Sequence, residues 1–156
     1  MTDPATRAIA RLTELGQTLA TAESLTGGSV GARLTDVPGA SAAYRGGLIV
    51  YATELKAELA GVALETLDRD GAVAESTAGE LAVGAASRCQ ATWGLSTTGV
   101  AGPDQQEGHP AGTVFVGLAR GEERVEVRRL SLAGDRAQIR RQTVDQALSL
   151  LLDHLG

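Results

Sequence analysis

The segment from residue 19 to residue 56 constrains the fold most, because it alternates short apolar runs with turn and helix signals. Residues 18–22 predict a buried strand, and residues 24–34 predict a turn that leads into a helix. Pro38 and Gly39 end that helix, and residues 44–51, with the apolar run LIVY as their centre, predict a second strand. A strand, a helix and a second strand in this order favour an α/β fold.

The remainder of the chain predicts further helices and a closing pair of strands. We expect helices at 4–15, 53–59, 63–69, 75–89 and 135–154, and strands at 93–102, 112–119 and 124–132. The last two strands flank a short turn and alternate apolar with charged residues, which predicts an antiparallel pair with one face partly exposed. We therefore expect one domain over residues 1–156, a three-layer α/β/α sandwich around a mixed sheet of about five strands.

Composition excludes several classes of function. The net charge is −5 and the arginines are spread along the chain, which disfavours binding to nucleic acid or to an anionic membrane. Cys89 is the only cysteine, and the sequence offers no Cys or His cluster for a metal site. No stretch approaches the roughly 18 apolar residues of a membrane span. We expect a cytoplasmic protein without a metal or another cofactor.

Lys56 is the first candidate for chemistry, because it is the only lysine among 14 lysines and arginines. Arginine stays protonated at working pH, whereas a lysine removed from water can lose its proton and act as a base. The alternative is a compositional bias that left one solvated lysine on the surface.

A hydroxyl-rich turn supplies a candidate nucleophile. Ser24 and Thr26 lie between a predicted strand and the N-terminus of a helix, where a hydroxyl can attack a carbonyl group. The amides of Gly27 and Gly28 would receive the resulting oxyanion. The alternative is that Ser24 or Thr26 only caps the helix, and Glu23 has no better claim than a solvated or capping carboxylate.

No histidine is well placed to activate the serine, because His109 lies in a predicted loop and His154 lies near the C-terminus. A Ser-His-Asp triad is therefore disfavoured. The remaining arrangement is Ser24 with Lys56 as its base and the Tyr51 hydroxyl as a proton relay.

Seven motifs in order resemble the CinA C-terminal domain family: TAESLTGG, LTDVPGASAAYRGG, VYATELKAELAGV, ETLDRDGAV, STTGVAGPD, PAGTVFVGLA and GDRAQIRRQTVDQAL. Active members of that family are nicotinamide-nucleotide amidohydrolases of the PncC type. They hydrolyse the carboxamide of nicotinamide mononucleotide to nicotinate mononucleotide and ammonia, without a metal. The resemblance implies that Ser24 is the nucleophile, Lys56 the general base and Tyr51 an accessory hydroxyl. It also implies a small pyridine nucleotide as partner and a homo-oligomer.

The resemblance extends to substrate binding. Two arginines near the start of the last helix lie four residues apart, where the helix dipole disfavours positive charge unless an anion is present. The phosphate of a mononucleotide would supply that anion, although pairing with Asp135 or simple exposure is the alternative. The expected substrate-binding residues are Thr26, Gly27, Gly28, Gly46, Thr98, Gly99, Gly102, Asp104, Arg136 and Arg140. The loop DQQEGHP departs from the family, which commonly has two glycines and a lysine there.

Two other functions compete with the amidohydrolase. A catalytically silent module of the same fold would bind a nucleotide or a partner without turnover. Phosphoryl transfer or pyrophosphate hydrolysis would require acidic metal ligands, and the P-loop signature is missing from the sequence.

Overall fold

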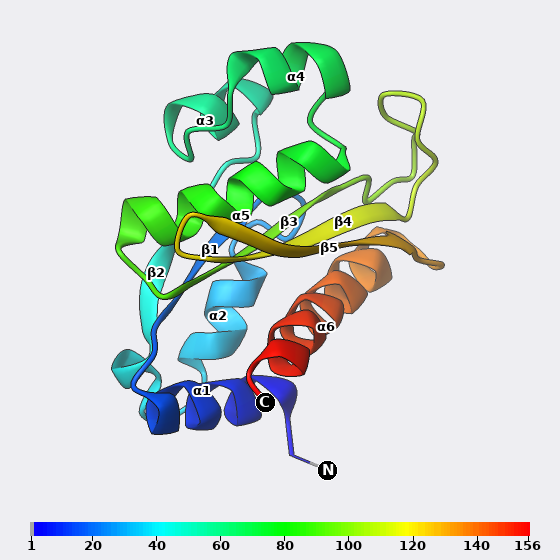
Figure 1. The fold of residues 1–156 in the computed structure, drawn as a ribbon. Coiled ribbons are helices and arrows are strands. Elements are labelled where there is room, and N and C mark those ends of the chain that lie inside the picture. The colour runs from blue at the N-terminus through cyan, green and yellow to red at the C-terminus, as the bar shows by residue number, and fades with distance from the viewer. Residues whose placement is uncertain (1) are drawn as a thin grey trace.

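The computed structural model describes residues 2–156, and Figure 1 shows its elements. The helices are α1 (Pro4–Leu15), α2 (Ser29–Thr35), α3 (Thr53–Glu58), α4 (Leu64–Asp70), α5 (Glu75–Cys89) and α6 (Arg136–His154), with a short 3₁₀ turn at Ala40–Ala42. The strands are β1 (Leu19–Glu23), β2 (Tyr44–Ile49), β3 (Trp93–Gly99), β4 (Thr113–Arg120) and β5 (Glu123–Ser131). The predicted order of helices and strands is therefore confirmed.

The five strands form one mixed sheet in the order β2-β1-β3-β4-β5. Strand β1 pairs in parallel with β2 and with β3, whereas β3 with β4 and β4 with β5 are antiparallel pairs. The predicted mixed sheet and closing hairpin are confirmed. Because β1, β2 and β3 are parallel, their carboxyl ends meet at one edge of the sheet, where α/β proteins commonly bind ligands.

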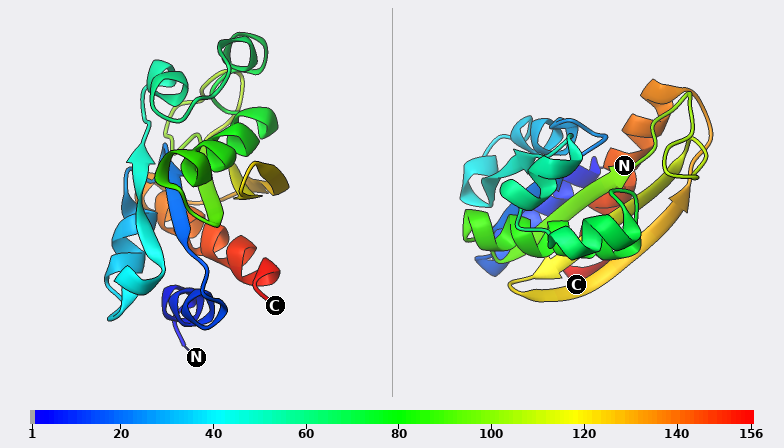
Figure 2. Two further views of the ribbon diagram at one scale, coloured as in Figure 1. Left: turned by 60° about the vertical axis from the view of Figure 1, so that its left-hand side comes forward. Right: turned by 90° about the horizontal axis from the view of Figure 1, so that it is seen from above.

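Helices cover both faces of the sheet, which confirms the three-layer prediction. Helix α5 crosses one face and α6 packs against the other, as Figure 2 shows. The larger apolar core lies on the side of α1, α2 and α6, and a smaller core of mostly small residues lies under α5. Helices α3 and α4 lie above α5 in Figure 1, near the carboxyl ends of the parallel strands.

Small residues let α5 approach the sheet closely. Ala78, Ala82 and Ala85 are fully buried. A Cβ atom added at Gly94 of β3 would lie 1.9 Å from the main-chain oxygen of Ala82, a distance that no real contact permits. Small residues on α5 and at Gly94 of β3 therefore set the distance between this helix and the sheet.

The second predicted strand is shorter than expected. It ends at Ile49, so the expectation that the run LIVY forms its centre is wrong. The physical reason is that the carbonyls of Val50 and Tyr51 turn out of the ladder to accept hydrogen bonds from Lys56. Likewise, the strand predicted at 93–102 ends at Gly99, where the chain enters the long loop that leads to β4.

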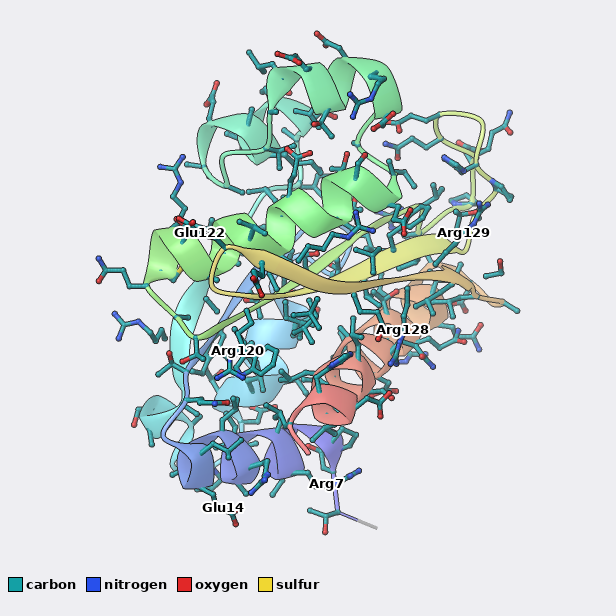
Figure 3. All side chains as sticks on the ribbon, viewed as in Figure 1. Arg7, Glu14, Arg120, Glu122, Arg128 and Arg129 are labelled. Carbon is teal, nitrogen blue, oxygen red and sulfur yellow. The ribbon has the colours of Figure 1, made fainter. Side chains whose placement is uncertain are left out.

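Strand β5 has a partly exposed face, as its alternating pattern predicts. Figure 3 shows charged side chains along the β4–β5 hairpin. The guanidinium of Arg129 lies 5.8 Å from the centre of the Phe115 ring, and Arg128 forms an ion pair with Asp153 of α6 at 2.8 Å. No helix within residues 2–156 is long and apolar enough to cross a membrane.

Candidate active site

The turn after β1 is held by a buried carboxylate. Glu23 is 2% exposed and accepts hydrogen bonds from the hydroxyl of Thr26 (2.6 Å) and from the amides of Val30 (2.9 Å) and Gly31 (3.0 Å). These contacts satisfy free amides at the start of α2, which is the capping alternative considered for Glu23. The carboxylate therefore fixes the turn that carries Ser24.

Ser24 and Lys56 meet at the carboxyl edge of the parallel strands. Lys56 lies on α3 and its side chain is 1% exposed, although it carries an amine. Its Nζ atom donates to Ser24 Oγ at 3.0 Å, and to the carbonyl oxygens of Val50 at 2.8 Å and Tyr51 at 3.3 Å. The structure thus excludes a surface position for the only lysine of the chain.

The environment of Lys56 increases the fraction of the amine that is neutral, compared with a lysine in water. Burial lowers the pKa of the Lys56 amine from 10.5 to about 8, while the negative charges of Glu107 and Glu54 act in the opposite direction and raise it. With a pKa of about 8, roughly one-tenth of the amines are neutral at pH 7. The amine can therefore accept a proton near neutral pH.

A pocket of about 430 Å³ opens beside this pair of side chains. Of the predicted site residues, those that line it are Ser24, Tyr51, Lys56, Thr98, Gly99, Gly102, Asp104 and Arg136. They come from the last two residues of β3, from the loops after β1, β2 and β3, from α3 and from the first turn of α6. A volume of this order suits a small ligand.

Tyr51 and Arg136 form the outer side of the pocket. The Tyr51 side chain is 63% exposed, and its hydroxyl accepts a hydrogen bond from Arg136 Nη2 at 3.2 Å. Arg136 Nη1 donates to the carbonyl oxygen of Gly102 at 2.6 Å. Lys56 thus contacts the main chain of Tyr51, while the tyrosine hydroxyl is bound to the arginine.

Five predicted binding residues do not line the pocket: Thr26, Gly27, Gly28, Gly46 and Arg140. Thr26 is fully buried, and its hydroxyl contacts Glu23 and the hydroxyl of Thr97. The amide of Gly27 donates to the carbonyl oxygen of Ser24 at 3.0 Å, so it closes the turn instead of facing a ligand.

The other three residues of that group belong to the turn after β1 or to β2, or hold that turn in place. Arg140 donates to the carbonyl oxygens of Leu25 (2.9 Å) and Thr26 (3.2 Å), and so holds the turn from the side of α6. Gly28 precedes α2 with φ = 103°, and Gly46 lies within β2 with φ = 144°. Main-chain carbonyl oxygens thus bind the Arg140 guanidinium at the position where the helix dipole predicted an anion.

The model of the CinA C-terminal domain family matches residues 1–155. The chain belongs to this family. A CinA-like protein of Frankia casuarinae is 52% identical over 140 residues, which are 90% of this chain and 32% of that protein. A putative competence-damage inducible protein of Geobacillus kaustophilus is 43% identical over 151 residues, 97% of this chain and 36% of that protein. The chain thus spans about a third of the length of these curated relatives.

Solved structures of the CinA superfamily have the same fold. The competence-damaged protein superfamily member from Klebsiella pneumoniae gives a TM-score of 0.94 at 32% identity, covering 97% of this chain and 95% of that chain. The competence/damage inducible protein from Agrobacterium tumefaciens gives a TM-score of 0.92 at 35% identity, covering 96% and 92%. The fold expected from the resemblance is thus shown.

Several residues that line or support the pocket were not among the expected substrate-binding residues. Ala72, Val73 and the two glutamines of the loop after β3 line the pocket, and Glu107 of the same loop binds the amides of Ala72 and Val73. The Glu107-Gly108 pair is a turn signal, yet no local pattern shows which amides a turn carboxylate will reach. Within residues 2–156, no group of three or more His, Cys, Asp or Glu side chains could hold a metal ion.

Proposed function

We propose that this chain is a serine amidohydrolase that converts nicotinamide mononucleotide to nicotinate mononucleotide and ammonia without a metal. One observation carries the proposal: a fully buried amine lies 3.0 Å from the Ser24 hydroxyl at the edge of a small-ligand pocket. A nucleophile within hydrogen-bond reach of a base is the arrangement that acyl transfer requires.

The contacts of Lys56 support its role as the base. A neutral amine has two N–H bonds and one lone pair. The carbonyl oxygens of Val50 and Tyr51 accept the two N–H bonds, which leaves the lone pair for the hydroxyl proton of Ser24. The same carbonyls bind the ammonium form after it has taken the proton.

The reaction follows from these roles. Ser24 Oγ attacks the carboxamide carbon as its proton passes to Lys56 Nζ, and the C–N bond breaks as that proton passes to the leaving nitrogen, which departs as ammonia. A water molecule then attacks the acyl carbon as its proton passes to Lys56 Nζ, and the bond to Ser24 Oγ breaks as that proton passes to Oγ, which releases the acid and restores the serine hydroxyl and the neutral lysine. We assign the oxyanion to the amide of Leu25, which follows the nucleophile and lines the pocket.

Arg136 is the residue that we assign to the phosphate of the substrate. Its guanidinium lies exposed at the pocket, in the first turn of α6, where a phosphate would offset the unfavourable helix dipole. The hydrogen bonds to Tyr51 and Gly102 orient it without neutralising its charge. Arginine is suited to phosphate because its N–H groups can bind two oxygens at once.

We expect Arg136→Met to raise the KM for nicotinamide mononucleotide by about tenfold or more, since a hydrogen bond to a charged group contributes roughly 1.5–3 kcal/mol. Nicotinamide riboside, which lacks the phosphate, should be affected much less. Ammonia release from both substrates measures the difference. Arg141→Met is the matched control, because Arg141 is exposed on the same helix and does not line the pocket. Equal effects on the two substrates would contradict the assignment.

The test of the proposed function is ammonia release from nicotinamide mononucleotide between pH 5.5 and 9.5. The base must be neutral, so kcat/KM should rise about tenfold per pH unit at low pH and level off above the Lys56 pKa of about 8. Nicotinate mononucleotide should appear in equal amount. A profile that falls over this range would contradict a lysine base.

The silent binding module is the alternative outcome of the same assay. It predicts saturable binding of the nucleotide, measured by calorimetry, with no ammonia at any pH. In that case Ser24 would also fail to react with an acylating probe, because its hydroxyl would not be activated.

A further inference from the structure

The segment 71–73 forms part of the pocket wall, although it lies between α4 and α5 and has no regular structure. Its main-chain groups are held by side chains from three different places. The Thr77 hydroxyl donates to the carbonyl oxygen of Gly71 at 2.6 Å, and the Thr98 hydroxyl donates to that of Ala72 at 2.7 Å. Glu107 accepts from the amides of Ala72 (3.1 Å) and Val73 (3.0 Å).

Glu107 is the member of this set that comes from the loop after β3. Figure 1 shows that loop beside α4. Glu107 and Gly108 have φ values of 53° and 80°, and the flanking Gln106 and His109 exchange main-chain hydrogen bonds of 3.0 and 2.8 Å. These features define a two-residue hairpin turn. A positive φ is unfavourable for glutamate, so the contacts of its carboxylate must stabilise this conformation.

Gly71 leaves space for the Glu107 carboxylate beside the 71–73 segment. Gly71 has φ = 84°, and a Cβ atom added there would lie 2.3 Å from Glu107 Oε1. Only glycine therefore leaves room for this contact. The two oxygens of one carboxylate thus bind two successive amides, which joins the 104–109 turn to the 71–73 segment beside the pocket.

We propose that Glu107 is a positioning residue, which fixes the turn carrying Gln105 and Gln106 against the 71–73 wall and thereby sets the shape of the substrate pocket. The two residues that Glu107 binds, Ala72 and Val73, line the same pocket as Gln105 and Gln106 of its own turn and as Lys56. The negative charge of Glu107 also raises the pKa of Lys56, against the larger effect of burial, which is consistent with its nearness to the amine. The effect on turnover rests on the proposed function, whereas the structural contact does not.

We expect Glu107→Ala to raise the KM for nicotinamide mononucleotide by about tenfold, with kcat changed by less than about threefold. The reason is that the pocket wall loosens while Ser24 and Lys56 keep their own contacts. Glu107→Gln keeps one acceptor oxygen and should recover part of the loss, which also covers the case in which the alanine variant does not fold.

Glu80→Ala is the matched control. Glu80 also binds a main-chain amide, that of Ala63 at 2.9 Å, and the hydroxyl of Thr66 at 2.6 Å, but it lies outside the active-site pocket. Its loss should lower thermal stability and leave KM within about twofold. If Glu107→Ala behaves like Glu80→Ala, with lower stability and unchanged KM, Glu107 only stabilises the fold and the proposal is overturned.

Amide hydrogen exchange gives a second readout that needs no turnover. In the wild type the amides of Ala72 and Val73 should be protected by Glu107, and in Glu107→Ala they should exchange at least about tenfold faster while the amides of β3 keep their rates. Unchanged exchange at both amides would overturn the positioning role. If the wild type releases no ammonia, the proposed function fails, and the exchange result still decides this proposal.

Discussion

Ser24→Ala and Lys56→Met are each expected to lower ammonia release from nicotinamide mononucleotide by about 10⁴-fold, because each removes one half of the nucleophile and base pair. The alanine variant has no oxygen to form the acyl enzyme. The methionine variant keeps a long apolar side chain in the site but has no lone pair at the position of Nζ, 3.0 Å from Ser24 Oγ. Initial rates at pH 8 measure both losses.

Ser29→Ala is the matched control for these variants. Ser29 begins α2, five residues after Ser24, and does not line the pocket, so its loss should leave the rate within about twofold. The double variant of Ser24 and Lys56 should be no slower than either single variant, since groups that act as a unit are not additive. A Lys56→Met enzyme that keeps a tenth of the wild-type rate would exclude the lysine as the base.

Between pH 7 and about pH 10.5, the free energy of unfolding of the wild type is expected to rise by roughly 3 kcal/mol relative to that of Lys56→Met. The pKa of Lys56 is about 8 in the folded state and 10.5 without the protein environment. Between these values the unfolded chain binds more protons than the folded one, so the free energy of unfolding increases with pH. Below pH 8 the Lys56 amine is protonated in both the folded and the unfolded protein, so the full free-energy cost of burying its charge remains.

Urea unfolding of both proteins at several pH values measures this difference. The variant has no amine at this position, so subtracting its free energy of unfolding removes the contribution of all other titrating groups. Ser29→Ala should run parallel to the wild type over the whole range. A difference between wild type and Lys56→Met that does not change with pH would show that the folded-state pKa of Lys56 is unshifted, and would remove the electrostatic basis of the mechanism.

The local pattern of the chain was sufficient for the architecture. Helix α5 was predicted at its observed bounds, and the mixed sheet with its closing hairpin followed from period, turn residues and the order of elements. The strand at 44–51 was predicted too long because apolar sequence is the signal for a strand, whereas Val50 is a core residue beyond the end of β2 and Tyr51 is exposed. Their carbonyls leave the ladder to bind the lysine.

The positions of the candidate site residues were predicted in part. Ser24 and Lys56 stand out by type, since a hydroxyl in a turn before a helix and a single lysine can each be recognised without coordinates. The sequence could not distinguish the ligand-facing residues from those that build the walls. Thr26 and Arg140 were expected to bind substrate, but they hold the turn. Glu107 was not singled out, although it joins two walls of the pocket.

By itself the sequence determined the α/β class, the succession of elements and the two residue types that make amide hydrolysis plausible, because these depend on spacing over a few residues. Only the tertiary structure decided that the lysine is buried against the serine, that the tyrosine hydroxyl faces Arg136, and that a glutamate from a distant loop binds the amides beside the pocket. Those outcomes depend on contacts between residues 32 to 85 positions apart, where side-chain packing and the need to satisfy buried polar groups determine which partners meet.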